Sequence, residues 1–281
     1  MQKRDSSAYV NDHGDKVFRM MSAYYTRYYR DSLGLSDWLE RVALRMDEER
    51  TFGGPVIDLC ERSTGMDFRG KQALVVGAGT GAELFALAER GASVHAIEPS
   101  GEALEILKMK SAELGLDGAD IQEGAAEDMP FADGSFDLVV CYMVLEHVND
   151  IRRSIDEMIR VARPGGVVFL SIPDYLYFYE GHYKLFCYPP ALPLGKRLLR
   201  AYLKRLGRPL DFMDGLNFIT SYGVLSILRE RKVGLLPPAQ IQREAARPSG
   251  SLLKRSVLSI FGIYSRLLEV SPQENIFIVK G

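Results

Sequence analysis

Cysteines and long apolar runs are scarce in this chain of 281 residues. The three cysteines, Cys60, Cys141 and Cys187, are widely spaced and form no CxxC pair, which argues against a disulfide framework or a zinc site and favours a reducing compartment. The longest uncharged runs, of about ten residues, are too short to span a bilayer. Residues 1–16 also lack the apolar run of a secretory signal. We therefore expect a cytoplasmic protein, with peripheral contact at the inner membrane face left open.

An excess of either charge is lacking as well. The 35 Lys and Arg residues nearly balance the 37 Asp and Glu residues, leaving a formal charge of -2. This balance argues against a protein that binds nucleic acid along its length, so no nucleic-acid partner is expected. The hydrophobic share of 47% is enough for one large core and makes a disordered chain a poor interpretation.

Short β-rich runs alternate with helical runs over residues 71–173. The predicted strands cover residues 73–76, 93–97, 120–122, 136–141 and 167–172, and the predicted helices cover residues 83–90, 102–114 and 151–161. Continuous apolar strands that alternate with helices are typical of a parallel sheet covered on both faces. The pattern therefore predicts an α/β fold with a doubly wound, mostly parallel sheet.

Three further segments flank this core. Residues 1–70 contain helical spacing on both sides of Gly34 and predict a helical N-terminal cap. In residues 174–220 an aromatic and proline-rich stretch precedes a basic amphipathic run, which predicts an acceptor-binding or lid insert. Residues 221–281 complete the sheet through helices near 222–231 and 251–269, a strand before Pro237 and a last strand at 276–279.

A glycine-rich turn, Gly-Ala-Gly-Thr-Gly-Ala at residues 77–82, follows the first predicted strand. Its glycines let the backbone approach a ligand closely, and the free N–H groups at the next helix start favour an electronegative group. Glu98 ends the second strand, where a carboxylate can accept both hydroxyl protons of a ribose. Together they predict a nucleoside-containing cofactor. The alternative without a ligand is that the glycines only form a tight strand-to-helix turn and that Glu98 is a solvated residue at a strand end.

The glycine loop alone suits either NAD(P) or S-adenosylmethionine, because alanine is allowed at the last place of GxGxxG/A. The choice rests on three downstream segments: GAAEDMPF at 124–131, FDLVVCYMVLEH at 136–147 and RPGGV at 163–167. In this order they make the chain resemble the class I S-adenosylmethionine-dependent methyltransferases, close to the ubiquinone-biosynthesis-like group, over roughly residues 70–173. The resemblance implies a Rossmann-like methyltransferase fold with a seven-stranded sheet, S-adenosyl-L-methionine as cofactor, and an enzyme that methylates an oxygen of a small-molecule, glycan or lipid-linked acceptor.

The resemblance also implies the residues of the cofactor site. These are Gly77, Ala78, Gly79 and Gly81 at the methionine end, Glu98 and Pro99 at the ribose, Ala126, Glu127 and Asp128 at the adenine, and Tyr142 beneath the cofactor. One departure is Ala125, where relatives often carry an Asp or Asn that bonds the adenine amino group. A second is that Met143 stands where some relatives have the first glutamate of a metal-binding ExxEH, so no metal is expected.

Two histidines are candidates for the catalytic base that a hydroxyl acceptor would use. His147 follows the fourth predicted strand, on the side where open α/β sheets bind ligands, and His182 begins the insert. An imidazole titrates near pH ~6.5, which suits proton removal at neutral pH. For both residues, packing or helix capping is an equally simple interpretation.

The insert concentrates positive charge. Residues 181–210 carry seven Lys or Arg and no acid, and on a helix over residues 196–206 the apolar side chains fall on one side and the bases on the other. Such a helix can lie on an anionic membrane, face an acidic substrate, or simply pack on the core. The insert is weakly similar to that of methyltransferases of bacterial surface-polysaccharide synthesis. Competing functions are an NAD(P)-dependent oxidoreductase and a catalytically silent cofactor-binding scaffold at the membrane surface.

Overall fold

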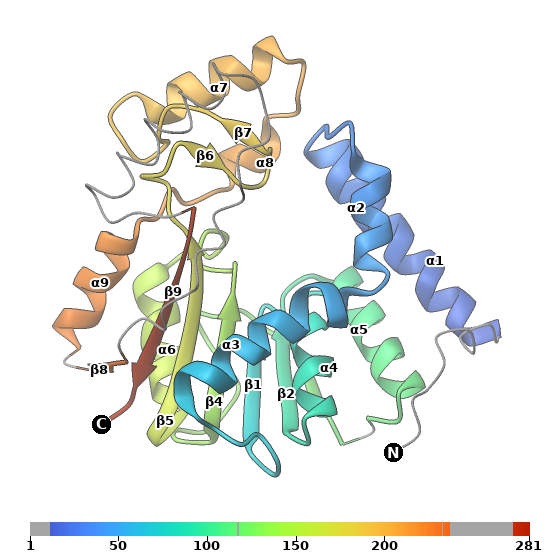
Figure 1. Ribbon diagram of the computed structural model, residues 1–281, viewed down its shortest axis with the longest axis vertical. Coiled ribbons are helices and arrows are strands. Elements are labelled where there is room, and N and C mark those ends of the chain that lie inside the picture. Colours follow the sequence, from blue (N-terminus) through green and yellow to red (C-terminus); the bar gives the residue numbers. More distant parts are fainter. Residues whose placement is uncertain (1–11, 117, 232, 237–271) are drawn as a thin grey trace.

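A seven-stranded sheet forms the centre of the computed structural model, which describes residues 12–116, 118–231, 233–236 and 272–281 (Figure 1). Its strand order is β3-β2-β1-β4-β5-β9-β8. The strands are β1 (Gln72–Val76), β2 (Ser93–Glu98), β3 (Asp120–Glu123), β4 (Phe136–Tyr142), β5 (Ala162–Pro173), β8 (Gly234–Leu235) and β9 (Gln273–Val279). The first five run parallel, and β9 is antiparallel to both of its neighbours. The predicted doubly wound, mostly parallel seven-stranded sheet is confirmed.

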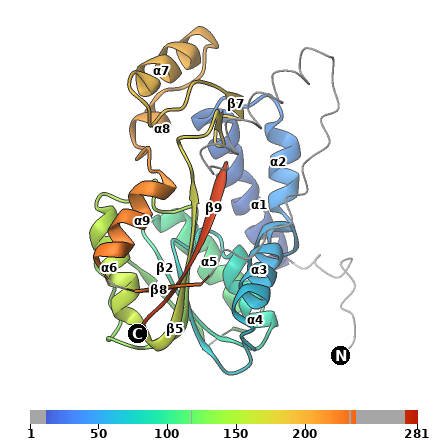
Figure 2. The ribbon, with the colours of Figure 1, turned by 60° about the vertical axis from the view of Figure 1, so that its left-hand side comes forward.

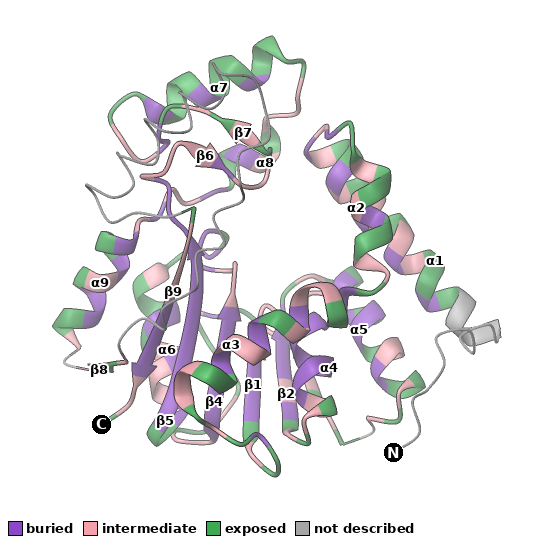
Figure 3. Cartoon of the chain, in the orientation of Figure 1, coloured by how far each residue is buried: buried purple, intermediate pink, exposed green. Residues whose placement is uncertain are grey.

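Alternate residues of each central strand face opposite layers of helices. In β1, Leu74 and Val76 pack with α6 (Ile151–Val161) and α9 (Ser221–Glu230). Ala73 and Val75 pack instead with α3 (Gly54–Thr64) and α4 (Ala82–Glu89). Both faces of the central sheet are therefore dry, which explains the consecutive apolar residues of β1 and β4, whereas β3 at the edge is polar and only partly buried. The buried strands appear as a purple layer between helices in Figure 3.

The remaining helices of the N-terminal half lead from the cap to the core. They are α1 (Asp12–Thr26), the π-helical turn η2 (Arg27–Ser32), α2 (Trp38–Arg45), the π-helical turn η3 (Glu49–Gly53) and α5 (Gly101–Glu113). Tyr25, Tyr29 and Leu33 of the cap share a hydrophobic cluster with Ile106 of α5. Although α3 also precedes residue 70, it covers the sheet.

The insert folds as a separate layer above the sheet and touches the cap. It contains the two-stranded β6 (Tyr179–Glu180) and β7 (Leu185–Phe186), then α7 (Gly195–Arg205) and α8 (Asp211–Asp214). Its buried residues Tyr183, Leu199 and Met213 belong to the same hydrophobic cluster as the cap. Figure 2 shows β7 next to the cap helices. Cap and insert, far apart in sequence, therefore meet over the carboxyl ends of the strands.

Two details of the secondary structure concern the sequence prediction. A proline and two glycines at 164–166 precede the predicted strand at 167–172, but β5 begins already at Ala162 and runs through them with a register shift against β4, where Gly165 has a φ of +75°. This is a β-bulge, in which Gly165 has a turn-like backbone conformation while β5 remains paired with β4 on both sides of it. The predicted helix at 251–269 lies outside the described residues.

Candidate functional site

The glycine loop joins β1 to α4 with its backbone in the left-handed region. Gly77, Gly79 and Gly81 have φ values of +64°, +54° and +105°. A Cβ added at Gly77 would stand 2.6 Å from Val144, and one added at Gly81 would stand 2.4 Å from Phe85, whereas at Gly79 nothing lies within 4 Å. Gly81 is therefore required by packing, and Gly79 faces the open space that a cofactor could enter.

Glu98, at the end of β2, is tied directly to this loop. Its carboxylate accepts hydrogen bonds from the N–H groups of Gly79 at 2.7 Å and Ser100 at 2.8 Å. Burial raises the pKa of Glu98, and these two bonds oppose the rise. A carboxylate has about four acceptor positions, so about two remain for a ribose diol. Of the two neighbouring residues that were also predicted for this site, Ala78 before Gly79 is buried and Pro99 after Glu98 is exposed.

The residues predicted for the adenine end have different surroundings. Ala126 is buried in the core. The carboxylate of Glu127 accepts hydrogen bonds from the N–H groups of Asn149 at 2.6 Å and Asp150 at 3.2 Å, so it braces the loop before α6. The side chain of Asp128 is 87% exposed. Because Glu127 is engaged by the backbone and Asp128 is exposed, Asp128 remains the acid that we predict to face the adenine.

The two predicted histidines come together at the carboxyl end of β4. Their ring centroids are 5.5 Å apart. Between them lies Glu146, whose Oε1 is 3.9 Å from Nε2 of His147 and 3.8 Å from Nε2 of His182. His182 also shares a 2.8 Å hydrogen bond through Nδ1 with Glu180. The four side chains, called the histidine–glutamate cluster below, join the end of the sheet to the insert.

The electrostatics of this cluster divide it into two pairs. Burial alone would lower the pKa of His182, but its hydrogen bond to Glu180 and the negative charges of Glu180 and Glu146 together outweigh burial and raise it. The same bond holds the pKa of the buried Glu180 below its usual value. Burial raises the pKa of Glu146 to about 7, and burial together with the nearby His182 lowers the pKa of His147 to about 4. His147 is therefore a neutral imidazole at neutral pH, and its side chain is 41% exposed.

The cluster bears on the expectation that no metal is bound. That expectation rested on Met143, which replaces the first glutamate of ExxEH. In the fold, His182 from the insert supplies a third donor beside Glu146 and His147, and their ligand atoms lie within 4.8 Å of one another. The ExxEH pattern covers only one short segment of the chain. It therefore could not include His182, which is 35 residues away from His147.

Aromatic side chains of the cap connect the cofactor loop to the histidine–glutamate cluster. Burial and the nearby Glu98 raise the pKa of Tyr24, and burial, with weaker contributions that include Glu146, raises that of Tyr28. Tyr28 also stacks edge-on against Phe212 of α8, at 5.6 Å between ring centroids. One helical turn of the cap therefore places Tyr24 toward the cofactor end and Tyr28 toward the histidines.

A buried acid that the sequence analysis missed fixes this cap in place. Glu48 is fully buried and accepts hydrogen bonds from the hydroxyls of Tyr25 at 2.8 Å and Thr80 at 2.6 Å. Lys110 of α5 pairs with it at 2.9 Å. Since Thr80 belongs to the glycine loop, this network joins cap, loop and α5. The charge run around Glu48 resembles a solvated helix face, so only the fold reveals the role.

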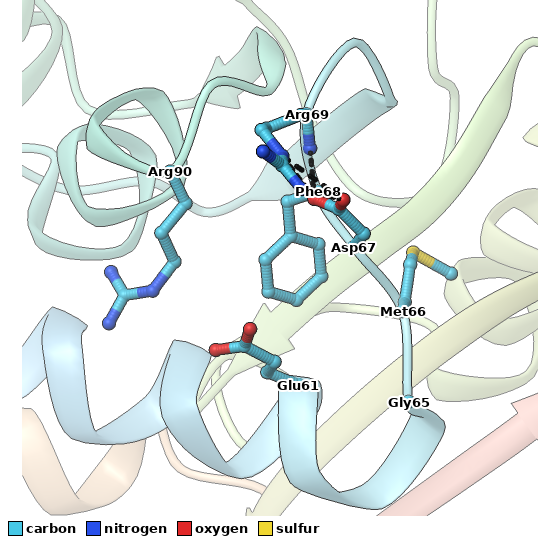
Figure 4. Close-up of a pocket in the computed structure, with 7 residues that line it drawn as sticks. All are labelled: Glu61, Gly65, Met66, Asp67, Phe68, Arg69 and Arg90. Carbon is cyan, nitrogen blue, oxygen red and sulfur yellow. Dashed lines mark hydrogen bonds and ion pairs between the residues drawn. The ribbon is translucent and has the colours of Figure 1, made fainter.

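A shallow depression lies elsewhere on the molecule (Figure 4). It is lined by Glu61, Gly65, Met66, Asp67, Phe68, Arg69 and Arg90. Residues 65–69 enter β1 and Arg90 follows α4, so the depression is at the amino ends of the strands. It is therefore at the opposite edge of the sheet from the glycine loop and cluster, and it is not part of the site.

Comparison with known proteins identifies the family of the domain that contains the glycine loop. Residues 74–170 match the family model described as a methyltransferase domain. The chain is 34% identical over 113 residues to a ubiquinone biosynthesis O-methyltransferase of Klebsiella pneumoniae, covering 40% of this chain and 46% of that protein. It is 41% identical over 105 residues to one of Pseudomonas aeruginosa, covering 36% and 44%. The chain thus spans less than half the length of these relatives.

Solved structures extend the likeness in fold. A putative sarcosine dimethylglycine methyltransferase from Galdieria sulphuraria superposes with a TM-score of 0.55 and 15% identity, covering 93% of this chain and 98% of that one. The [4+2]-cyclase SpnF superposes with a TM-score of 0.51 and 19% identity, covering 80% and 79%. At such identities the likeness concerns the fold, and the cyclase illustrates that one fold hosts different reactions.

Proposed function

We propose that this chain, which carries a class I S-adenosylmethionine-dependent methyltransferase domain over residues 74–170, transfers a methyl group to a hydroxyl oxygen. The domain match confirms the predicted cofactor, S-adenosyl-L-methionine, and the predicted class of enzyme. It disfavours the NAD(P) alternative that the glycine loop alone allowed. Transfer to oxygen is supported by the relatives named as O-methyltransferases and by the cluster described above.

The observation that carries the proposal is the position of the histidine–glutamate cluster next to the glycine loop. Val144, which precedes the cluster by two residues, is the side chain that a Cβ at Gly77 would meet. The segment that leaves β4 therefore passes against the loop predicted to hold the methionine end of the cofactor. An acceptor next to His147 would stand close to the donor methyl group.

Methyl transfer from a sulfonium depends mainly on positioning, because the donor is already cationic and its leaving group is neutral. A hydroxyl acceptor additionally loses a proton, and a group that accepts it contributes about 10² to 10⁴ in rate. His147 is neutral at neutral pH and partly exposed, so its imidazole is available. Its pKa of about 4 makes it a weaker base than an ordinary imidazole, so an acidic hydroxyl such as a phenol would match it better than an alkyl alcohol. The aromatic walls Tyr24, Tyr28 and Phe212 would suit the face of such a ring.

The test is a screen of phenolic, sugar and lipid-linked hydroxyl acceptors with methyl-labelled cofactor, followed by mapping of the methylated atom. We expect an O-methyl product, and a turnover that falls at least ~10²-fold in His147→Ala with S-adenosylhomocysteine affinity nearly unchanged. His182→Ala is measured alongside it. The control is His95→Gln, whose side chain bonds Gln72 on the sheet. Methylation of nitrogen or carbon alone would overturn the proposal. Full turnover in both cluster variants would show that positioning alone carries the reaction and that neither histidine is catalytic.

The surface of the insert supports an acceptor linked to a membrane. None of the helices in the described residues has the length and apolar character to cross a bilayer. Helical spacing predicts that all apolar residues of 196–206 lie on one side, but the structure divides them. Leu199 and Leu203 are buried, while a stripe at every fourth position is exposed. The stripe consists of Leu194, Leu198, Tyr202 and Leu206, with exposures of 38–62%.

Bases border this stripe. Lys196, Arg197, Lys204 and Arg205 of α7 are all exposed. Leucines that enter the headgroup region and bases that meet anionic lipid are the pattern of an interfacial helix. We therefore propose that α7 rests on the inner face of a membrane and brings the site to a lipid-linked acceptor. A water-dissolved small molecule or glycan is the alternative.

A further inference from the structure

We propose that Glu146, His147 and His182 form a binding site for a divalent transition-metal ion. Each offers one ligand atom, and these atoms lie within 4.8 Å of one another. Two donors leave the end of β4 together, and the third comes from the insert. The ion's role in holding an acceptor oxygen rests on the proposed methyl transfer, but its binding does not.

The first argument is the state of Glu146. Its side chain is completely buried, and among the described residues no donor lies within hydrogen-bond distance of either carboxylate oxygen. The imidazole nitrogens at 3.8 and 3.9 Å are too distant for hydrogen bonds. A buried polar group left unpaired costs about 1–3 kcal/mol, and more when it is charged. A cation between the three donors would satisfy this carboxylate.

The second argument is that one ligand is already oriented. Nδ1 of His182 is held by Glu180 at 2.8 Å, and Glu180 in turn accepts a hydrogen bond from the N–H of Tyr183. With Nδ1 engaged, Nε2 is the nitrogen that faces Glu146. A carboxylate that fixes the far nitrogen of a histidine ligand is a regular feature of metal sites. The buried Glu180 would have this positioning role.

The third argument is geometry and donor type. Metal bonds of about 2.0–2.2 Å place tetrahedral ligands roughly 3.3 Å apart, whereas the donors here are 3.8 and 3.9 Å from Glu146 and all lie within 4.8 Å of one another, so side-chain rotations must draw them together around the ion. Imidazole favours zinc, iron, nickel and copper, whereas magnesium and calcium favour sites made of oxygen. Three protein ligands leave a coordination position open, and the partly exposed His147 marks where it could be reached.

An ion at this position would act on the acceptor. A coordinated hydroxyl loses its proton more readily, because the positive charge stabilises the alkoxide or phenolate. Metal binding would require both imidazoles to be neutral and Glu146 to be ionised. Together with Glu180 the cluster would then carry two negative charges that a dication balances. His147 would then be a metal ligand, and the coordinated oxygen would lose its proton to solvent.

The test uses the full chain, stripped with a chelator and titrated with Co²⁺ in the absence of cofactor and acceptor. Visible d–d absorption reports coordination, and competition with Zn²⁺ and Mg²⁺ gives the preference. We expect one Co²⁺ per chain, displaced by Zn²⁺ but not by equimolar Mg²⁺. Affinity should fall at least about tenfold in Glu146→Gln and His182→Asn, and about ten- to a hundredfold in Glu180→Gln. The matched control His95→Gln should bind as the wild type does.

Wild-type protein that develops no Co²⁺ absorption would overturn the proposal without reference to any variant. Equal binding by wild type and Glu146→Gln would also overturn it, provided that circular dichroism shows both folded. The two proposals fail separately. Methylation at full rate in the presence of chelator would overturn the metal's proposed role in the reaction and leave the proposed methyl transfer intact. Metal binding without oxygen methylation of any acceptor would do the reverse.

Discussion

Glu98→Gln should weaken binding of S-adenosylhomocysteine about ten- to a hundredfold. In the structure, two acceptor positions of Glu98 are taken by the N–H groups of Gly79 and Ser100, and the others are available to a ribose diol. A hydrogen bond to a charged group contributes about 1.5–3 kcal/mol, and each 1.4 kcal/mol corresponds to about a tenfold change in affinity. The amide that replaces one oxygen would in addition turn an N–H donor toward the diol or toward the loop.

The pH dependence provides a second, independent part of this prediction. The ionised carboxylate is the form that accepts both diol protons. Because burial raises the pKa of Glu98, this form is lost at a higher pH than for an ordinary glutamate. Affinity of the wild type should therefore be full above that raised pKa and decline as pH falls through it. Glu98→Gln carries no titrating group here, so its weaker affinity should not show this decline.

Calorimetric titration from about pH 5 to pH 8 measures both parts, since an ordinary glutamate titrates near ~4.3. The matched control is Glu89→Gln, at the exposed end of α4, which should bind as the wild type does. Unchanged affinity in Glu98→Gln would show that Glu98 does not hold the cofactor. Identical pH profiles for wild type and Glu98→Gln would show that its ionisation is irrelevant.

Three further predictions concern the cap, the loop and the insert. Glu48→Ala breaks a buried ion pair with Lys110, which costs about 3 kcal/mol and lowers the melting temperature by about 6–12 °C; a shift below ~2 °C in calorimetry would contradict the network. Gly79→Arg should abolish cofactor binding and lower the melting temperature by only about 2–8 °C, because the added Cβ meets nothing within 4 Å and a non-glycine residue at a φ of +54° costs about 1–2 kcal/mol; retained S-adenosylhomocysteine affinity would place the cofactor elsewhere. Wild-type protein should sediment with anionic vesicles at low salt and not at high salt, and the double variant Leu198→Glu, Lys204→Glu should not sediment; equal results with neutral and anionic vesicles would contradict attraction of the bases to anionic lipid.

The sequence by itself determined the core of this protein. Apolar strands at 73–76 and 136–141 and the glycine turn at 77–82 are local patterns, and the structure places β1, β4 and the loop there. They could be predicted because strand burial, turn conformation and helix starts depend on neighbouring residues. The same reasoning identified Glu98, since the end of a strand next to such a loop has a defined place in a parallel sheet.

Only the tertiary structure decided how the acceptor side is arranged. His182 meets Glu146, and Glu48 meets Thr80, across more than 30 residues of chain. Glu48 resembles a solvated charge in its own segment, and its burial arises because the cap closes on α5. Likewise, Met143 suggested the loss of a metal ligand, whereas the fold brings His182 of the insert beside Glu146 and His147. These contacts depend on how cap and insert pack against each other, and residue spacing carries no information about packing between distant segments.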